Sequence, residues 1–466
     1  MKRKLITLLL VLSMVFGLVA CGGSKGQDET VGNNGSTEEI PEKPDYTVTV
    51  SAAVTITGDA FTTLQKAAED FNASQTDYKI DLYYGGGYGD ILTVIQTSSP
   101  NDIPDLYMTS GNGSGLILNQ EQYYVPVQKF IDEDNYDTSD IVKFFGSNFK
   151  KNGEWVAVPW GSSNVGQFWN KDLLAKVGLK VEDMDSYEDI LAACDKLAAA
   201  GYKNFYGMTQ FTHNDGFNCA LASEGINYMD ENNGRDGIPS TYLYEENKKC
   251  KQAALDYFTF VREMIDRGYT SDIKLTASDL QNGFAKGDYV AIDSYCSRTS
   301  TILGLVKGAF EVAYQPGPTV HADVKTKGQA PAGSCFIIGK SGNYWTERGA
   351  WEFIKYLLGN ADINAQYAID TGYTPSTYSA TNSDIYQAYV NNVFPDVKRL
   401  LDAQNATPEN IGYALSPVQS EAQSHFVTIL NNMYYDSSYT AEKAMKNFSD
   451  QCNESLELYR ITQGLE

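Results

Sequence analysis

The feature of this chain that most constrains its fold is a repeated change between strand-like and helix-like patterns that begins at Tyr46. Apolar residues occupy every second position over 46–52, which predicts a strand, and then recur at helical spacing over 61–71. Residues 78–84 again favour a strand. A strand, a helix and a second strand in this order predict a parallel βαβ unit at the start of the folded part.

The same alternation continues along the chain. Further strands are predicted at 106–108, 205–209 and 289–292, and helices at 121–131, 184–200, 247–268, 279–286 and 350–358. Gly287 and Gly359 follow two of these helices and are expected to end them. From about 385 onward the pattern is mostly helical, with a last helix that runs to about 460. The fold class is therefore α/β, and because about 400 residues exceed one comfortable core, two lobes are expected.

The charge balance and the few histidines limit the possible functions. The 466 residues include 36 Lys and Arg against 59 Asp and Glu, a formal net charge of -23. Because such a balance repels phosphate backbones, no nucleic-acid partner is expected. The three histidines, His213, His321 and His425, leave few general bases or zinc ligands. No metal site and no cofactor are predicted.

Motifs of hydrolytic enzymes are missing from the sequence. There is no G-x-S-x-G and no H-E-x-x-H, the patterns that place a nucleophile or a zinc ion. A pair of catalytic carboxylates stays open, because acidic residues are too numerous to test by inspection. The prediction is that the chain is not an enzyme.

Residues 1–20 predict an export signal. Basic residues at 2–4 precede an apolar run over 5–20, which is shorter than the roughly 20 residues that span a bilayer. The run ends in LVACG, which resembles the bacterial lipobox, and this resemblance implies that Cys21 is lipidated, with palmitate among its acyl chains. The alternative is that Cys21 only ends a simple anchor helix. Residues 21–45 then predict a flexible tether, so we expect a lipoprotein on the extracellular face of the cell membrane.

The other six cysteines would lie in an exported chain, where disulfides can form. They are Cys194, Cys219, Cys250, Cys296, Cys335 and Cys452. No C-x-x-C pair is present and the spacing fixes no pairing, because six cysteines admit fifteen connectivities. Cys194 lies in an apolar helical context, which favours a buried free thiol.

Two loop motifs have ordinary interpretations. The glycine-rich segment 85–89 follows a strand but completes neither G-x-G-x-x-G nor a phosphate-binding loop, so it predicts a mobile loop that presents Tyr88. Residues 230–237 resemble a calcium loop, yet Arg235 stands where glycine is needed and Thr241 where a bidentate Glu is needed. The second motif therefore predicts a solvated turn.

Several segments in a fixed order resemble one known family. They are VPWGSS at 158–163 with GQFWNKDLLAKVGL at 166–179, NGFAKGDYVA at 282–291, AGS at 332–334, WEFIKYL at 351–357 and TGYTP at 371–375. Together they resemble the family 1 extracellular solute-binding proteins of bacterial ABC importers, the group that includes the maltose-binding and glycerol-3-phosphate-binding proteins. The similarity covers about residues 46–460.

The resemblance implies a two-lobe periplasmic-binding-protein-like fold of type II, with three hinge crossings and a ligand cleft between the lobes. The crossings are expected near 159–164, 292–298 and 331–336. The implied N-terminal lobe comprises 46–160 plus 297–333, and the C-terminal lobe comprises 161–296 plus 334–466. Closure of such lobes around a ligand is a hinge motion.

The resemblance also implies which residues line the cleft. The aromatic candidates are Tyr88, Trp160, Tyr295 and Tyr373, with core or surface packing as the alternative for each. Flat rings cover the apolar C–H face of a sugar while polar groups bond its hydroxyls. Ser162, Ser163 and Ser334 would be hydroxyl or backbone donors, and Asp293 is the carboxylate nearest the second crossing.

The ligand class is the harder question. The layout is most similar to the glycerol-3-phosphate-binding branch, whose ligand contacts match Tyr88, Ser163 and Tyr373. Thr109 stands where that branch has a glutamate and Ser420 where it has an arginine, and losing the arginine removes a planar donor fork suited to phosphate. Arg298 precedes a possible helix start and would hold an anion there, or else form a surface salt bridge.

These expectations combine into one function. The chain is predicted to be the membrane-anchored extracellular substrate-binding subunit of an ABC transporter that captures a carbohydrate, as mono- or oligosaccharide. The alternative ligand is glycerol 3-phosphate or another sugar or polyol phosphate, and the remote alternative is a secreted carbohydrate-active enzyme. The expected partners are two permease subunits with a cytoplasmic ATPase, and the chain itself is expected to be a monomer.

Overall fold

The computed structural model describes residues 40–99, 102–111, 113–202, 206–207, 210–243, 248–324 and 328–465. By its contacts the chain divides into two units, Met1–Glu42 and Lys43–Glu466. The predicted signal, Cys21 and the tether up to residue 39 lie outside the described residues, so the account below concerns the second unit.

Two sheets organise the second unit. The strands are β1 (Val48–Val54), β2 (Tyr78–Tyr84), β3 (Leu106–Ser110), β4 (Tyr124–Val125), β5 (Lys150–Lys151), β6 (Glu154–Trp155), β7 (Val158–Pro159), β8 (Val165–Asn170), β9 (Tyr206–Gly207), β10 (Ala291–Tyr295), β11 (Val312–Pro316) and β12 (Ser334–Gly339). The first sheet has the order β2-β1-β3-β12-β4, with β7 paired to β12, and the second has the order β11-β8-β10-β9.

Helices cover both sheets. The α-helices before β10 are α1 (Gly58–Ser74), α2 (Tyr88–Thr97), α3 (Gly115–Leu118), α4 (Gln128–Asp134), α5 (Gly146–Phe149), α6 (Lys171–Lys176), α7 (Tyr187–Ala199), α8 (Gln210–Ser223), α9 (Asp230–Gly234), α10 (Lys248–Asp266) and α11 (Ala277–Lys286). Those after it are α12 (Thr299–Val306), α13 (Tyr344–Leu358), α14 (Ala361–Thr371), α15 (Tyr378–Thr381), α16 (Asp384–Asn392), α17 (Val397–Ala406), α18 (Gln419–Tyr435) and α19 (Ala441–Thr462). Short 3-10 turns are η2 (Lys143–Phe145), η3 (Val181–Asp183) and η4 (Cys296–Arg298).

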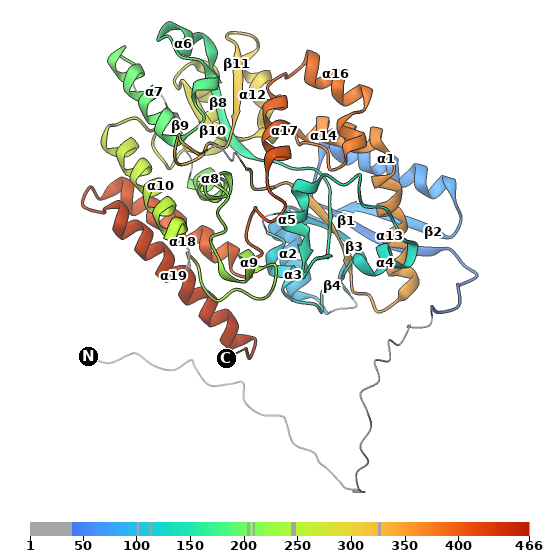
Figure 1. Ribbon diagram of the computed structural model, residues 1–466. Helices are drawn as coiled ribbons and strands as arrows, with labels where there is room; N and C mark the ends of the chain where they lie inside the picture. Colours follow the sequence, from blue (N-terminus) through green and yellow to red (C-terminus); the bar gives the residue numbers. More distant parts are fainter. Residues whose placement is uncertain are drawn as a thin grey trace, which may run out of the picture. The chain divides into compact units, whose positions relative to one another are not determined.

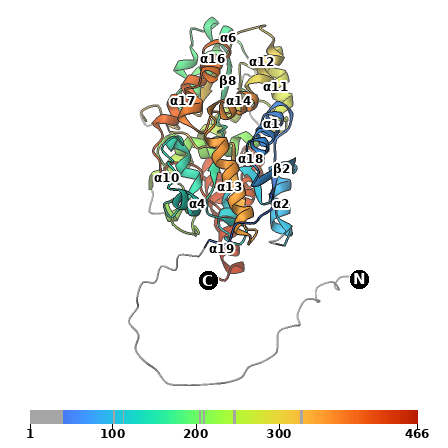
Figure 2. The same ribbon diagram turned by 90° about the vertical axis from the view of Figure 1, so that its right-hand side faces the viewer.

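We call the first sheet and the helices on it the first lobe. β1 pairs with both β2 and β3 in parallel, so the predicted βαβ start is confirmed. The helix α1 buries Leu64, Ala68 and Phe71 in the core, and α13 buries Trp351 and Phe353 in the same cluster. Figure 2 shows α13 at the centre of the view with α1 and α2 along one edge.

We call the second sheet and its helices the second lobe. Successive residues of β8 point to opposite faces, so Trp169 enters the core cluster of α7, α8, α10, α18 and α19, while Phe168 enters the cluster of α11, α12, α16 and α17. Because both faces are covered, all six residues of β8 are buried. Figure 1 shows α10, α18 and α19 side by side on one flank of this sheet.

Several local predictions are confirmed and one is wrong in part. The helix at 279–286 is α11, and Gly287 ends it in the left-handed region with φ 84°. The six cysteines after Cys21 are all free and buried, as expected for Cys194. The helix predicted over 121–131 begins only at Gln128, because Tyr124 and Val125 pair with β12 as strand β4.

The structure corrects the predicted lobe boundaries. Residues 334–339, expected in the C-terminal lobe, form β12, whose hydrogen bonds go to β3 and β7 of the first sheet. Residues 312–316, expected in the N-terminal lobe, form β11 on the second sheet. A strand belongs to the sheet whose neighbouring strands form hydrogen bonds with its backbone groups. Both predicted lobe assignments, for 334–339 and for 312–316, are therefore wrong.

The prediction of a crossing at 292–298 is also wrong, because β10 pairs with β8 of the second sheet. The chain leaves the first sheet after β7 and returns over 317–333, close to two of the expected crossings. The expected crossing at 292–298 instead lies within the second lobe, where β10 is followed by η4 and α12. The third crossing runs through α14 and residues 372–377: Tyr367 packs in the first core cluster, whereas Ala365, Ala368 and Ala380 pack in a cluster of the second lobe.

The loop at 230–237 also differs from the solvated turn that was predicted. Asn233, Gly234 and Arg235 are buried, and residues 231–233 adopt left-handed backbone angles. The Arg235 guanidinium donates to the backbone oxygen of Tyr413 at 2.9 Å. The segment therefore faces solvent at Glu231, Asn232 and Asp236, as predicted, and its buried residues fasten the loop before α18.

Candidate functional site

The glycine-rich loop brings Tyr88 to the start of α2. Gly86 has φ 98°, and a Cβ on Gly85 would lie 2.5 Å from Ile91, so glycine is required by the backbone and by packing. The Tyr88 hydroxyl lies 3.4 Å from the Tyr373 hydroxyl. The loop thus places a first-lobe tyrosine against the third crossing.

Tyr373 is held where two crossings meet. Its ring covers Gly161, which has φ 90° and whose Cβ, if present, would lie 3.0 Å from the Tyr373 ring. Ser162 and Thr374 exchange backbone hydrogen bonds of 3.0 and 2.9 Å. The first and third crossings are therefore joined directly beside this tyrosine.

The second lobe contributes Tyr295 and Arg298 near the same place. Gly372 abuts η4, since its Cβ would lie 3.0 Å from Ser297. The Arg298 guanidinium is exposed, and its charge lowers the pKa of Tyr373, which burial raises overall. Tyr373 in turn raises the pKa of Tyr295. Groups from both lobes and a crossing therefore act on one another here.

Tyr295 binds a buried carboxylate that the sequence did not suggest. Its hydroxyl donates to Asp215 on α8, a side chain that is 1% exposed. Burial and the Asp215 charge together hold the pKa of Tyr295 and of Tyr413 well above the ordinary tyrosine value. Asp215 is one of 59 acidic residues and lies in no recognisable motif, so no pattern could have selected it.

Asp293 lies apart from this group. It is buried inside the second lobe, where it accepts hydrogen bonds from the Tyr206 hydroxyl at 2.6 Å and the Gln167 amide at 3.3 Å. Burial raises the pKa of Asp293 to about 7, although both donors oppose the shift. Its position in the sheet fits a core polar group rather than a ligand contact.

The predicted serines fasten the crossings. The Ser334 hydroxyl donates to the Trp160 backbone oxygen at 2.6 Å, and the Ser162 hydroxyl donates to Asn164 at 3.0 Å. The Cys296 thiol lies 3.9 Å from the Ser163 hydroxyl. All three serines are buried, so their hydroxyls serve the hinge region in this structure.

The three remaining candidate site residues are Trp160, Thr109 and Ser420. Trp160 is fully buried and packs on Phe336 and Tyr367, with ring centroids 5.9 and 5.6 Å away, which is the core packing that was the alternative. Thr109 is buried in β3. Ser420 lies exposed in the first turn of α18.

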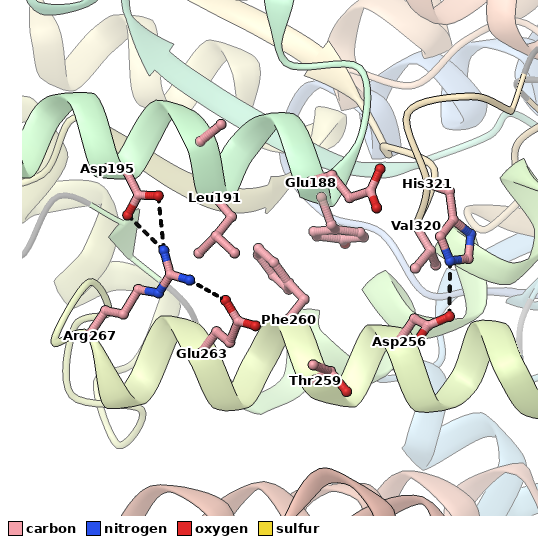
Figure 3. Close-up of a pocket in the computed structure, with 12 residues that line it drawn as sticks. Glu188, Leu191, Asp195, Asp256, Thr259, Phe260, Glu263, Arg267, Val320 and His321 are labelled. Carbon is pink, nitrogen blue, oxygen red and sulfur yellow. Dashed lines mark hydrogen bonds and ion pairs between the residues drawn. The ribbon is translucent and has the colours of Figure 1, made fainter.

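Two pockets lie elsewhere, and neither is lined by a predicted site residue. A groove of about 570 Å³ runs between α7 and α10, with Arg267 bridging Asp195 and Glu263 at one end and His321 over Asp256 at the other, as Figure 3 shows. A second pocket of about 470 Å³ lies between α17 and the segment after β11.

None of the helices among the described residues is both long and apolar enough to span a bilayer. Within the same residues, no cluster of three or more His, Cys, Asp or Glu side chains is suited to hold a metal ion.

Known proteins resemble the chain in sequence and in fold. The chain is 25% identical over 331 residues to the sn-glycerol-3-phosphate-binding periplasmic protein UgpB of Salmonella paratyphi A, a match that covers 69% of this chain and 73% of that protein. The cyclic alpha-maltosyl-1,6-maltose binding protein of Arthrobacter globiformis superposes with a TM-score of 0.70 at 17% identity, over 88% of this chain and 99% of that one. UgpB of Mycobacterium tuberculosis in complex with glycerophosphocholine gives a TM-score of 0.64 at 16% identity, over 90% of this chain and 100% of that one.

These likenesses establish the fold as the two-lobe architecture of periplasmic binding proteins. The family model described as bacterial extracellular solute-binding protein matches residues 66–395, most of the described fold. The chain therefore belongs to the family of bacterial extracellular solute-binding proteins.

Proposed function

We propose that this chain captures a carbohydrate outside the cell and delivers it to an ABC permease. The observation that carries the proposal is the contact between the hydroxyls of Tyr88, from the first lobe, and Tyr373, from a crossing that packs on η4 of the second lobe directly after Tyr295. A ligand that touches all three would favour one arrangement of the lobes, which is the signal a permease needs to detect.

The chemistry of these side chains suits a sugar. Each tyrosine offers a flat apolar ring and a protonated hydroxyl, whose pKa burial raises further above its ordinary value. Rings of this kind cover C–H faces, while the hydroxyls exchange hydrogen bonds with the sugar rim. The maltose-related relative named above is consistent with this ligand class.

Glycerol 3-phosphate or another sugar or polyol phosphate is the second candidate. Two relatives are UgpB proteins, and Arg298 stands exposed beside Tyr373 at the start of α12. No hydrogen bond or ion pair joins Arg298 to another residue within the described part of the chain, so its guanidinium is available to an anion. A single exposed cation is a weak basis for phosphate selectivity, because water screens it.

A thermal-shift screen separates the two ligand classes. We expect maltose, raffinose, cellobiose or lactose to raise the melting temperature by binding the folded state, as RT ln(1 + [L]/Kd) requires. sn-Glycerol 3-phosphate is expected to leave the melting temperature unchanged. Stabilisation by the phosphate ester alone would contradict the carbohydrate proposal.

The anchor and the partners form a further part of the proposal. Residues 1–20 would direct export, Cys21 would carry the lipid, and two permease subunits with a cytoplasmic ATPase would receive the sugar from a monomeric binding protein. Labelling cells with an alkyne fatty acid tests the anchor, since Cys21→Ala should remove the label. Overnight incubation with the bound sugar tests the absence of enzymatic turnover, because the sugar should be recovered unaltered.

A further inference from the structure

We propose that the groove between α7 and α10 docks a basic amphipathic helix of a partner protein. The groove has a volume of about 570 Å³, and none of the three tyrosines of the proposed sugar site lines it. Both helices belong to the second lobe, and Figure 3 shows the groove between them. The proposal therefore concerns a second surface of the protein and does not depend on the ligand proposed above.

The floor of the groove is apolar and preformed. The rings of Tyr187 and Phe260 pack with their centroids 4.5 Å apart and are 3% and 6% exposed. The Tyr187 backbone amide also donates to the Thr319 backbone oxygen at 2.8 Å. Beside these rings, Leu191 is half-buried and Ala192 is exposed. An occupant therefore meets an apolar surface that needs little ordering on binding.

Each wall of the groove carries two carboxylates that are seven residues apart. They are Glu188 and Asp195 on α7, and Asp256 and Glu263 on α10. Seven residues make about two helical turns, or about 10 Å. Figure 3 shows the apolar side chains of the groove between these two acidic ends. Both walls therefore have the same order, in which an apolar centre lies between two acidic positions.

The cations of the groove balance only part of this negative charge. Arg267 bridges the two carboxylates at one end, and His321 lies 2.9 Å from Asp256 at the other. Four carboxylates thus line the groove with two cations, so negative charge remains in excess even when His321 is protonated. Glu188 accepts from the backbone amide of Ala322 at 2.8 Å, a contact that does not cancel its charge. The rim of the groove therefore attracts a positively charged partner.

These features fit a helix whose apolar side chains lie between two basic residues. Lysines seven positions apart on one face of a helix have the same spacing as the carboxylates on each wall. Leucines between them would reach the floor, which is the helix-in-groove mode of recognition. The lysine stems cover apolar surface while their ammonium groups reach the carboxylates. A small cation would use only the acidic ends, so the apolar floor is what favours a helix.

A designed peptide tests the proposal. The probe is an alanine-based helical peptide with two lysines seven residues apart and two leucines between them on the same face. Fluorescence anisotropy at pH 7.5 should show saturable binding in the micromolar range. The same peptide with alanine in place of both leucines should bind at least tenfold more weakly, because the apolar contact is lost. No saturable binding, equal binding of the two peptides, or displacement of the probe by an equal concentration of spermidine would overturn the proposal.

Variants of α7 show whether the probe uses the groove. Ala192→Lys places a positive charge in the groove and should weaken probe binding at least tenfold, and Glu188→Gln should weaken it about threefold. Ala199→Lys is the matched control, because Ala199 is exposed on the same helix and does not line the groove, so its affinity should stay within twofold. Equal affinity of Ala192→Lys and Ala199→Lys would overturn the proposal. If Ala192→Lys does not fold by circular dichroism, unchanged probe binding by Glu188→Gln overturns it instead.

Discussion

Two hydrogen bonds of the site differ in what they connect. The Tyr88–Tyr373 contact joins the first lobe to the third crossing, is 3.4 Å long and links two neutral hydroxyls. The Tyr295–Asp215 contact lies wholly within the second lobe and links a hydroxyl to a buried carboxylate. The first is a weak contact between parts that a hinge motion separates, and the second is a strong contact inside one rigid part.

The two hydrogen bonds also differ in strength, and this difference indicates which of them a hinge motion would break. A neutral hydrogen bond contributes about 0.5–1.5 kcal/mol, and less when it is long, whereas one to a charged group contributes about 1.5–3 kcal/mol. Opening the lobes would therefore break the Tyr88–Tyr373 contact at small cost and leave Tyr295 fixed. The contact with Asp215 therefore fixes Tyr295 within the second lobe, and the Tyr88–Tyr373 contact is the one of the two that a hinge motion would change.

The largest effect is expected when Tyr295 is changed. Tyr295→Phe leaves the buried Asp215 without one of its donors, which should lower the free energy of unfolding by about 2–3 kcal/mol. Urea unfolding followed by circular dichroism measures this. Tyr413→Phe is the control, because the contact of the Tyr413 hydroxyl with the Cys219 sulfur, at 3.8 Å, is long and involves no charged group. An equal loss in both variants would contradict a special role for the charged contact.

A smaller effect is expected at the crossing. Gly161→Ala places a Cβ 3.0 Å from the Tyr373 ring at φ 90°, and should destabilise the fold by about 1–2 kcal/mol while displacing Tyr373. Gly178→Ala provides the control, since φ is 72° there and nothing lies within 4 Å of the added Cβ. The amount by which Gly161→Ala lowers the free energy of unfolding more than Gly178→Ala measures the clash with the Tyr373 ring. If the two variants unfold alike, Tyr373 is not held by this contact.

Most helices and strands could be predicted from the sequence, because the spacing of apolar residues and the positions of glycines determine them locally. The alternation over 46–84 gave β1, α1 and β2, and Gly287 ends α11 as expected. The lobe boundaries could not be found in this way. Residues 334–339 form a buried strand that is compatible with either sheet, and only the long-range pairing with β3 decides between them.

The candidate site was predicted in part for a related reason. Tyr88, Tyr295 and Tyr373 followed from a resemblance, and the hydroxyls of Tyr88 and Tyr373 lie 3.4 Å apart in the structure. Trp160 looked equally suitable, but its place in the core depends on Phe336 and Tyr367, which lie far away in the chain. Asp215 belongs to no sequence motif, and its hydrogen bond with Tyr295 joins residues that are 80 positions apart.

Another charged contact of the second lobe should make stability depend on pH. His321, on the segment that returns to the first lobe, lies between Glu224 at 2.9 Å and Asp256 at 2.9 Å, and Glu188 accepts from the next backbone amide. Burial lowers the pKa of His321, but the two carboxylates outweigh it and raise the pKa overall. The histidine, seen over Asp256 in Figure 3, is therefore stabilised in its charged form.

The direction in which stability changes with pH follows from the raised pKa of His321. Because the folded-state pKa of His321 is above the unfolded value of 6.5, the stabilisation is complete below that value and is lost as the pH rises through the folded pKa. The loss should be about 1 kcal/mol or less, since the pair is partly solvated. Melting temperatures between pH 5.5 and 8.5 should show it, and His321→Gln should remove it. His425→Gln is the control, because the His425 ring lies 2.9 Å from the Ser455 hydroxyl and forms no ion pair with a carboxylate among the described residues. A dependence on pH that survives in His321→Gln would exclude the His321 contacts as its source.

The smallest effect on stability is expected at the contact between the lobes. Tyr88→Phe and Tyr373→Phe should each lower the free energy of unfolding by about 0.5 kcal/mol, because a neutral hydrogen bond of 3.4 Å contributes little. A double-mutant cycle should give a coupling of about 0.5 kcal/mol or less in the free protein. With a bound sugar the same cycle should give a larger coupling in affinity, because the ligand holds both hydroxyls in place at once. A coupling that is already large without ligand would mean that the two tyrosines form a fixed structural pair, and the contrast with Tyr295 and Asp215 would be lost.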